Sequence, residues 1–214
     1  MWSDFCRVAT TFALAAAGTL ASAQIPPVAG QDFLVLDPPR PVAPGETIEV
    51  IEFFYYGCPV CYESQPHIAR WLASAGADVS LTRVPSAFTA DGESYALTFH
   101  ALLAQGGLAQ LHGPVYENHH FEDRRLSEEK NLLDWLARNG VDAEAFRAVR
   151  HSAQNRARMA EGRRIFEIYG VRAVPAFAVD GRYLTSARLA NGVKEMMAVV
   201  EHLVERARED RRNR

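Results

Sequence analysis

The run TIEVIEFFYY at residues 47–56 constrains the fold more than any other stretch of this 214-residue chain. Its β-branched and aromatic residues occupy both faces, which suits a central strand that is buried on both sides. Gly57 breaks the run, and from Pro59 onward apolar residues return with helical spacing. The apolar face of this expected helix carries Ile68, Trp71, Leu72 and Ala75. The alternating run at 79–84 indicates a second strand, so the sequence predicts a β-α-β unit with a sharp strand-to-helix turn.

Two cysteines lie at the expected start of this helix, in the sequence YYGCPVCYE. Cys58 would lie at or near the N-cap and Pro59 at the first helical position, where the missing N–H costs nothing. The free backbone N–H groups and the helix dipole then favour a thiolate at Cys58, and the thiolate is the nucleophile of disulfide exchange. Cys61 lies one turn further along the same face, from which it can resolve a mixed disulfide. The spacing therefore indicates an attacking and a resolving thiol on one rigid element.

A metal site and a pair of inert thiols are the other uses of two such cysteines. A metal site needs further ligands, commonly a second C-x-x-C or spaced histidines. His119 and His120 are adjacent and His67 follows on the helix, so we expect all three to be surface residues and predict no metal and no cofactor. A bridge across so small a loop adds little stability, and inert packing does not explain Pro59. A non-catalytic copper or zinc carrier that uses the two thiols stays open as an alternative.

The first 23 residues have the features of a secretory signal peptide. Arg7 precedes an uncharged, small and apolar run at 8–23, which ends in an A-x-A cleavage pattern. The run is too short for a comfortable membrane span, and no later stretch is apolar enough to be one. Cys6 lies within this segment, so the mature chain would keep only the C-x-x-C pair. We therefore expect a soluble, exported protein of residues 24–214.

The rest of the chain predicts an α/β fold. A short apolar strand is expected at 33–36, and residues 92–155 show helical spacing without a good strand, which predicts a helical insertion with a helix N-cap at Ser127. Another helix is expected at about 155–169. Strand character then returns in AFAV and RYLT, and Asp180-Gly181 between them is a strong hairpin signal. The net charge of −3 and hydrophobic content of 48% argue against disorder and against a nucleic-acid partner.

The segment EFFYYGCPVCYE resembles the active-site segment of the DsbA family, the periplasmic thiol:disulfide oxidoreductases of the thioredoxin superfamily. A second segment, YGVRAVPAFAVDGRY at 169–183, resembles the cis-proline loop and following hairpin of that family. The resemblance implies a thioredoxin fold with an inserted helical domain. It also implies that Cys58 is the nucleophile and Cys61 the buried resolving thiol.

The same resemblance implies roles for three residues outside the cysteine pair. Pro175 would be the cis-proline that faces the pair, and Val174 before it would offer its backbone to an extended substrate strand. Glu52 matches the acidic residue beneath the family's active site, where it would accept protons from Cys61 and tune the pair. An acid on a strand that is buried on both sides is unusual, which agrees with a special role for Glu52.

Val60 departs from the family's pattern. Between Pro59 and the second cysteine the family typically carries histidine, which helps to stabilise the thiolate. Valine neither donates a hydrogen bond nor carries charge, so Pro59 and Val60 would tune this active site differently, and we expect a weaker oxidant with the same exchange chemistry.

The resemblance implies a periplasmic dithiol oxidase that passes a disulfide to reduced or unfolded exported proteins. A membrane partner of the DsbB type would reoxidise it. We expect a monomer. The short lead-in before residue 47 leaves no room for the N-terminal domain through which the superfamily's isomerases dimerise, which argues against a disulfide isomerase. A periplasmic disulfide reductase stays open as an alternative because of Val60.

Overall fold

The computed structural model describes residues 26–43, 45–122 and 124–213, and the predicted signal peptide at 1–23 lies outside them. Within these residues the chain forms a mixed sheet of five strands in the order β1-β5-β4-β2-β3. The strands are β1 (Leu34–Val35), β2 (Ile48–Phe54), β3 (Val79–Pro85), β4 (Ala176–Val179) and β5 (Tyr183–Ser186). The helices are α1 (Pro59–Ser74), α2 (Ala90–Ala104), α3 (Leu108–Phe121), α4 (Glu129–Arg138), α5 (Ala143–Arg150), α6 (Ala153–Tyr169) and α7 (Val193–Arg212). The order of strands and helices confirms the predicted α/β class.

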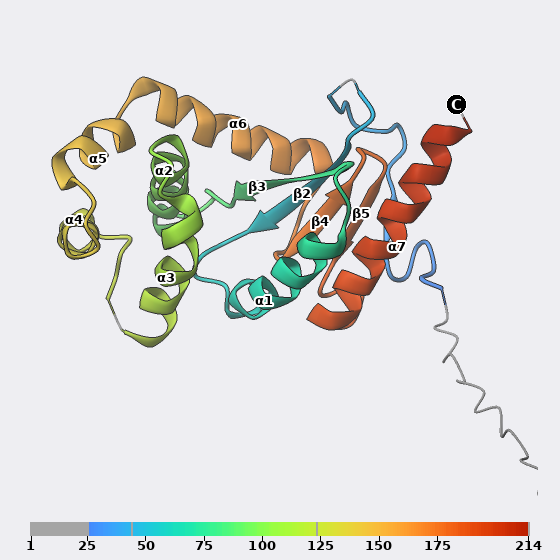
Figure 1. Cartoon of the computed structure of the whole chain (residues 1–214), viewed down its shortest axis with the longest axis horizontal. Coiled ribbons are helices and arrows are strands. Elements are labelled where there is room, and N and C mark those ends of the chain that lie inside the picture. The colour runs from blue at the N-terminus through green and yellow to red at the C-terminus, as the bar shows by residue number, and fades with distance from the viewer. Residues whose placement is uncertain (1–25, 44, 123, 214) are drawn as a thin grey trace, which may run out of the picture.

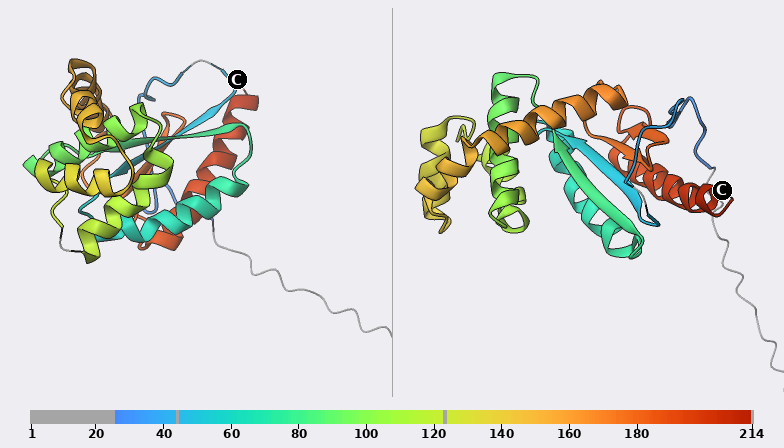
Figure 2. Two further views of the ribbon diagram at one scale, coloured as in Figure 1. Left: turned by 60° about the vertical axis from the view of Figure 1, so that its left-hand side comes forward. Right: turned by 90° about the horizontal axis from the view of Figure 1, so that it is seen from above.

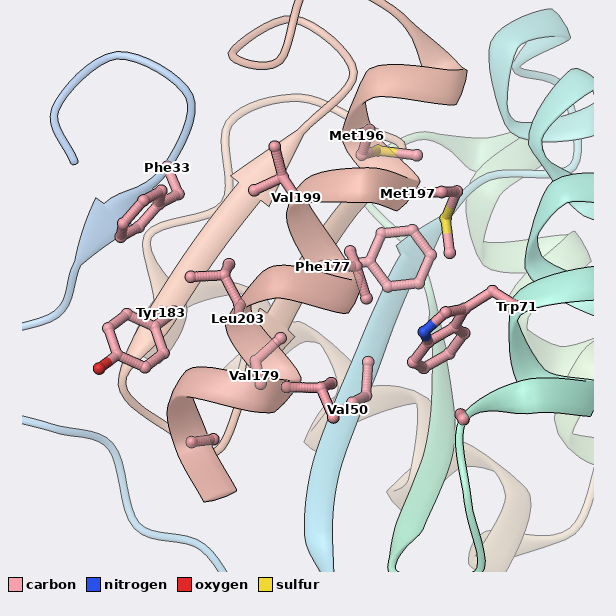
Figure 3. Packing of buried hydrophobic residues seen from close by; sticks show 14 of the residues in the cluster. Phe33, Val50, Trp71, Phe177, Val179, Tyr183, Met196, Met197, Val199 and Leu203 are labelled. Carbon is pink, nitrogen blue, oxygen red and sulfur yellow. The ribbon is translucent and has the colours of Figure 1, made fainter. Parts of the chain in front are cut away.

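Strand β2 is central and is buried on both faces, as its composition predicted. It pairs in parallel with β3 and antiparallel with β4. Helices α1 and α7 lie side by side on one face, whereas α6 covers the other (Figures 1 and 2). Figure 3 shows how α1 and α7 meet the sheet: Trp71 and Met197 lie beside Phe177 of β4, with Val50 of β2 next to them. On the other face Phe53 packs edge-on against Phe166 of α6, with ring centroids 4.8 Å apart.

Helices α2 to α5 form a separate group at the end of the sheet toward which β2 points (Figure 1). Their core contains Phe99, Leu132 and Phe146, and the last residues of the central strand region, Phe54 and Tyr56, are fully buried in it. Helix α6 then leads the chain back over the sheet (Figure 2). The segment between β2 and α1 therefore lies where the sheet meets the helical group.

Local sequence signals gave mixed results. Asp180 and Gly181 have φ values of 51° and 64°, as a type I′ hairpin between β4 and β5 requires, so this prediction is confirmed. The predicted N-cap at Ser127 is wrong: Glu128 is the N-cap of α4, and the carbonyl of Ser127 accepts a hydrogen bond from Ser94 Oγ at 2.6 Å. Helix α3 was not singled out by the sequence. None of the described helices is both long and apolar enough to cross a membrane.

Candidate active site

Cys58 is the N-cap of α1, as the sequence predicted. Its backbone is extended, with φ −92° and ψ 115°, and its Sγ accepts a hydrogen bond from the backbone N–H of Cys61 at 3.3 Å. Pro59 occupies the first helical position, where no N–H is required. The thiol therefore sits on the open end of a helix, where backbone N–H groups and the helix dipole favour negative charge.

A tight turn delivers Cys58 to this position. The backbone N–H of Cys58 donates to the carbonyl of Tyr55 at 3.0 Å, which closes the turn between β2 and α1. Gly57 allows the turn to pack closely, because a Cβ at this position would lie 2.5 Å from ring atoms of Tyr55. Any other residue would displace that ring, which lies 6.1 Å from the ring of Tyr95. Glycine thus has a steric reason to precede the first cysteine.

The two cysteines are free thiols in unequal surroundings. The Cys61 thiol beside Cys58 lowers the pKa of Cys58 to about 6, with help from the backbone N–H groups of Cys61 and Val60, although partial burial opposes the shift. Cys61 is 0% exposed, and its burial and its hydrogen bond to Cys58 raise its pKa. At neutral pH the outer sulfur is therefore mainly a thiolate and the inner sulfur a thiol. This inequality is what the predicted roles of attacking and resolving sulfur require.

The loop before β4 faces the outer cysteine. The Val174–Pro175 peptide bond is cis, as expected from the resemblance. Cys58 Sγ lies 3.6 Å from the carbonyl oxygen of Val174, to which it can donate a hydrogen bond only in its protonated form. Pro175 is buried, and its carbonyl accepts a hydrogen bond from the N–H of Ala187 at 3.3 Å. The structure thus brings together Cys58 and Val174, which lie far apart in the sequence.

Glu52 lies beneath α1 on the central strand and is 0% exposed. Its carboxylate accepts hydrogen bonds from Gln65 Nε2 at 2.9 Å and from Arg83 Nε at 2.8 Å. Burial raises the pKa of Glu52, and the Arg83 charge and the Gln65 hydrogen bond partly oppose this. Gln65 Nε2 also donates to the carbonyl of Cys61 at 3.1 Å, so Gln65 links the buried acid to the inner cysteine. Gln65 and Arg83 were not identified as site residues from the sequence, because only the fold brings α1 and β3 around the Glu52 carboxylate.

The expectation that His119 and His120 are plain surface residues is wrong. Both are half-buried, and each makes a hydrogen bond near the active site. His119 Nδ1 lies 2.7 Å from the hydroxyl of Tyr95, and His120 Nε2 lies 3.0 Å from the carbonyl of Tyr56. His112, also on α3, lies 2.7 Å from the hydroxyl of Tyr56 through its Nδ1. Helix α3, which the sequence analysis did not predict, thus places three histidines against tyrosines near the cysteine turn.

Two further predicted positions lie on the surface of α1. Val60 is 38% exposed and follows the half-buried Cys58 by two residues. His67 is half-buried and lies 3.1 Å from Arg70 Nη2 through its Nδ1. Among the residues that the structure describes, no group of three or more His, Cys, Asp or Glu side chains could hold a metal ion.

A half-buried low-pKa thiol that is paired with a buried high-pKa thiol suits thiol–disulfide exchange, because such a pair provides one sulfur that can attack and a second that is held in reserve. The surrounding sheet and helices match the thioredoxin-type fold of known DsbA structures. The class of protein is therefore a thiol:disulfide oxidoreductase.

Comparison with known proteins gives the family. Residues 66–204 match the family model of the DSBA-like thioredoxin domain. The chain is 32% identical over 180 residues to the thiol:disulfide interchange protein DsbA of Pseudomonas aeruginosa, covering 84% of this chain and 85% of that protein. It is 34% identical over 207 residues to the DsbA of Bordetella pertussis, covering 96% of this chain and 98% of that protein.

Solved structures agree with this result. The crystal structure of Pseudomonas aeruginosa DsbA is 31% identical, with a TM-score of 0.82 over 86% of this chain and 96% of that chain. DsbA of Xylella fastidiosa is 26% identical, with a TM-score of 0.78 over 86% of this chain and 98% of that chain. The chain belongs to the DSBA-like thioredoxin family and is an oxidoreductase of the disulfide-donating type. The comparisons do not favour the reductase, isomerase or metal-carrier alternatives.

Proposed function

We propose that the protein carries a disulfide between Cys58 and Cys61 and transfers it, in the periplasm, to reduced or unfolded exported proteins. The observation that carries this proposal is the inequality of the pair, with the pKa of Cys58 lowered to about 6 and Cys61 fully buried. A stable thiolate on the reduced form makes the disulfide a readier oxidant. Val60 removes a further stabilising group, so the protein would be a weaker oxidant than histidine-bearing relatives.

The exchange takes two steps. A substrate thiolate attacks Sγ of Cys58, the Cys58–Cys61 bond breaks, and Cys61 leaves and takes up a proton. A second thiolate of the substrate then attacks the substrate sulfur of the mixed disulfide. A disulfide forms within the substrate, and Cys58 leaves as a thiolate. The substrate loses two electrons and gains one disulfide, while the cysteine pair gains both electrons. Glu52 would supply the proton that Cys61 takes up and accept it again on reoxidation.

The loop at Val174 and Pro175 would hold the substrate during these steps. The Val174 carbonyl lies 3.6 Å from the sulfur that the substrate must reach, so an extended strand paired to this backbone would place its own cysteine beside Cys58. Pro59 would support the same geometry by starting α1 at the first cysteine.

The remaining expectations belong to the same proposal. Residues 1–23 would direct export and be removed, and the helical insertion at about 92–155 would flank the active site. The mature protein would act as a monomer without a cofactor. A membrane protein of the DsbB type would regenerate the disulfide.

Disulfide transfer to a reduced, denatured ribonuclease is the direct test. The oxidised protein should transfer one disulfide per molecule and restore ribonuclease activity over repeated cycles in a glutathione buffer. Cys58→Ser should abolish transfer, while a protein treated identically but never oxidised serves as the blank. Stoichiometric binding of copper or zinc without disulfide transfer would instead establish the carrier function.

A further inference from the structure

One imidazole of α3 reaches the turn that presents the outer cysteine. His120 Nε2 lies 3.0 Å from the carbonyl oxygen of Tyr56. A carbonyl only accepts, so this nitrogen is the donor and carries the proton. Tyr56 lies two residues before Cys58, inside the turn that the Cys58 N–H closes on Tyr55. The hydrogen bond therefore holds a peptide unit of the cysteine turn itself.

The same ring also contacts the chain after the outer cysteine. The rings of His120 and Tyr62 are stacked, with centroids 5.6 Å apart and planes inclined by 28°. The backbone N–H of Tyr62 donates to the carbonyl of Cys58 at 3.1 Å in the first turn of α1. His120 thus contacts one residue on each side of Cys58, and its two contacts bracket the sulfur-bearing residue.

Helix α3 is anchored firmly enough for these contacts to matter. Val115 and Tyr116 are fully buried in the core of the helical group. One face of the helix also carries His112, whose Nδ1 lies 2.7 Å from the hydroxyl of Tyr56. Tyr56 is therefore held at its hydroxyl by His112 and at its carbonyl by His120. Tyr56 is therefore one of the points at which the helical group holds the turn.

We propose that His120 is a positioning residue of disulfide exchange, which fixes the Tyr56 peptide so that the N–H groups of Val60 and Cys61 stay aimed at the Cys58 sulfur. The proposal rests on the proposed role of Cys58 as nucleophile. Without the hydrogen bond the Tyr56 peptide is free to reorient, and the turn holds Cys58 less firmly at the N-cap. Alignment of the donors is what gives charge-assisted hydrogen bonds their strength.

The test compares His120→Leu, His120→Gln and His120→Asn in the full chain. Glutamine places an N–H donor at about the reach of Nε2, whereas asparagine is one carbon shorter and leucine donates nothing. We expect His120→Leu and His120→Asn to raise the pKa of Cys58 by about half a unit, which is roughly a threefold change in the thiolate equilibrium. The equilibrium constant with glutathione should shift about threefold toward the oxidised protein. His120→Gln should stay near the unsubstituted protein on both measures.

His119→Leu is the matched control, because His119 is on the same helical turn but its Nδ1 meets the Tyr95 hydroxyl instead of the cysteine turn. It should change neither the thiolate titration nor the glutathione equilibrium. If His120→Leu lowers only the melting temperature, or if His119→Leu shifts the titration equally, the positioning role is overturned. If the leucine variants fail to fold, the comparison of His120→Gln with His120→Asn decides alone. A normal thiol pKa in the unsubstituted protein would instead contradict the proposed function itself.

Discussion

Replacing Val60 with histidine should make the protein more oxidising. Val60 is 38% exposed beside Cys58, so a histidine there would be partly solvated. For an imidazolium about 5 Å from the thiolate, Coulomb's law gives about 0.8 kcal/mol at a dielectric constant of ~80 and about 1.7 kcal/mol at ~40. One pKa unit corresponds to about 1.4 kcal/mol, so the pKa of Cys58 should fall by roughly 0.6 to 1.2 units. The reduction potential should rise by about 20 to 35 mV, because about 30 mV corresponds to 1.4 kcal/mol in a two-electron couple.

The assay for this prediction has two independent parts. The ultraviolet absorbance of the thiolate is titrated in the reduced Cys61→Ser background, and the potential is measured with both cysteines present in glutathione buffers. Val60→Leu is the control, since leucine changes the shape of the side chain without adding a donor or a charge. If Val60→His leaves both quantities where Val60→Leu leaves them, or moves them the other way, residue 60 does not set the redox poise of this protein.

Four further predictions concern the rest of the site. Cys61→Ser should trap mixed disulfides through Cys58, because its Cys58 thiolate attacks a substrate disulfide and no second thiol of the protein resolves the product, whereas Cys58→Ser should trap few; non-reducing electrophoresis after incubation with a disulfide-bonded substrate measures both, and equal trapping would contradict the assignment. The rate of attack by the reduced protein on a small disulfide should rise as pH increases through about 6, following ionisation of Cys58, and then level off; a rise centred near the pKa of an ordinary thiol would refute the lowered value. Glu52→Gln should stabilise the protein at neutral pH, because the raised pKa of Glu52 makes its ionised form costly in the fold, and the gain should disappear as pH falls toward the ordinary carboxyl value of 4.5. Denaturant unfolding at both pH values measures this, and a loss of stability at neutral pH would contradict it. Pro175→Thr should slow substrate release and accumulate mixed disulfides, since it changes the residue beside the proposed docking strand; unchanged release rates would separate Pro175 from substrate binding.

The parts of the site that depend on neighbours in sequence could be predicted. Cys58 at the N-cap and Pro59 at the first helical position follow from the order glycine, cysteine, proline after a strand. Burial of β2 on both faces follows from the β-branched and aromatic residues on its two faces, with Glu49 and Glu52 as the exceptions. The hairpin at Asp180 follows from the preference of Asp-Gly for positive φ. In each case the deciding interaction acts over a few residues of the chain.

The parts that depend on tertiary contacts could not be predicted. Helix α3 has many polar residues and an internal Pro114 in its sequence, and the polar Asn118 lies on its buried face with Leu111, Val115 and Tyr116, which weakens the apolar pattern. Without that helix in view, nothing in the chain indicates that His120 would meet Tyr56, 64 residues away. Gln65 and Arg83 likewise meet Glu52 only because α1 and β3 flank β2.

In the proposed mechanism, the unequal pair also decides which sulfur a substrate attacks. Leaving-group ability alone would favour attack at Cys61, since the low-pKa Cys58 thiolate would then depart. Cys61 is 0% exposed, however, so an incoming thiolate reaches only Cys58, and Cys61 must leave despite its raised pKa. The first step is therefore the one that needs a proton near Cys61, and a buried carboxyl with a raised pKa is a better proton donor near neutrality than an ordinary one. The second step expels Cys58 as a stabilised thiolate and needs no such help, so loss of the Glu52 carboxyl should slow formation of the mixed disulfide rather than its resolution.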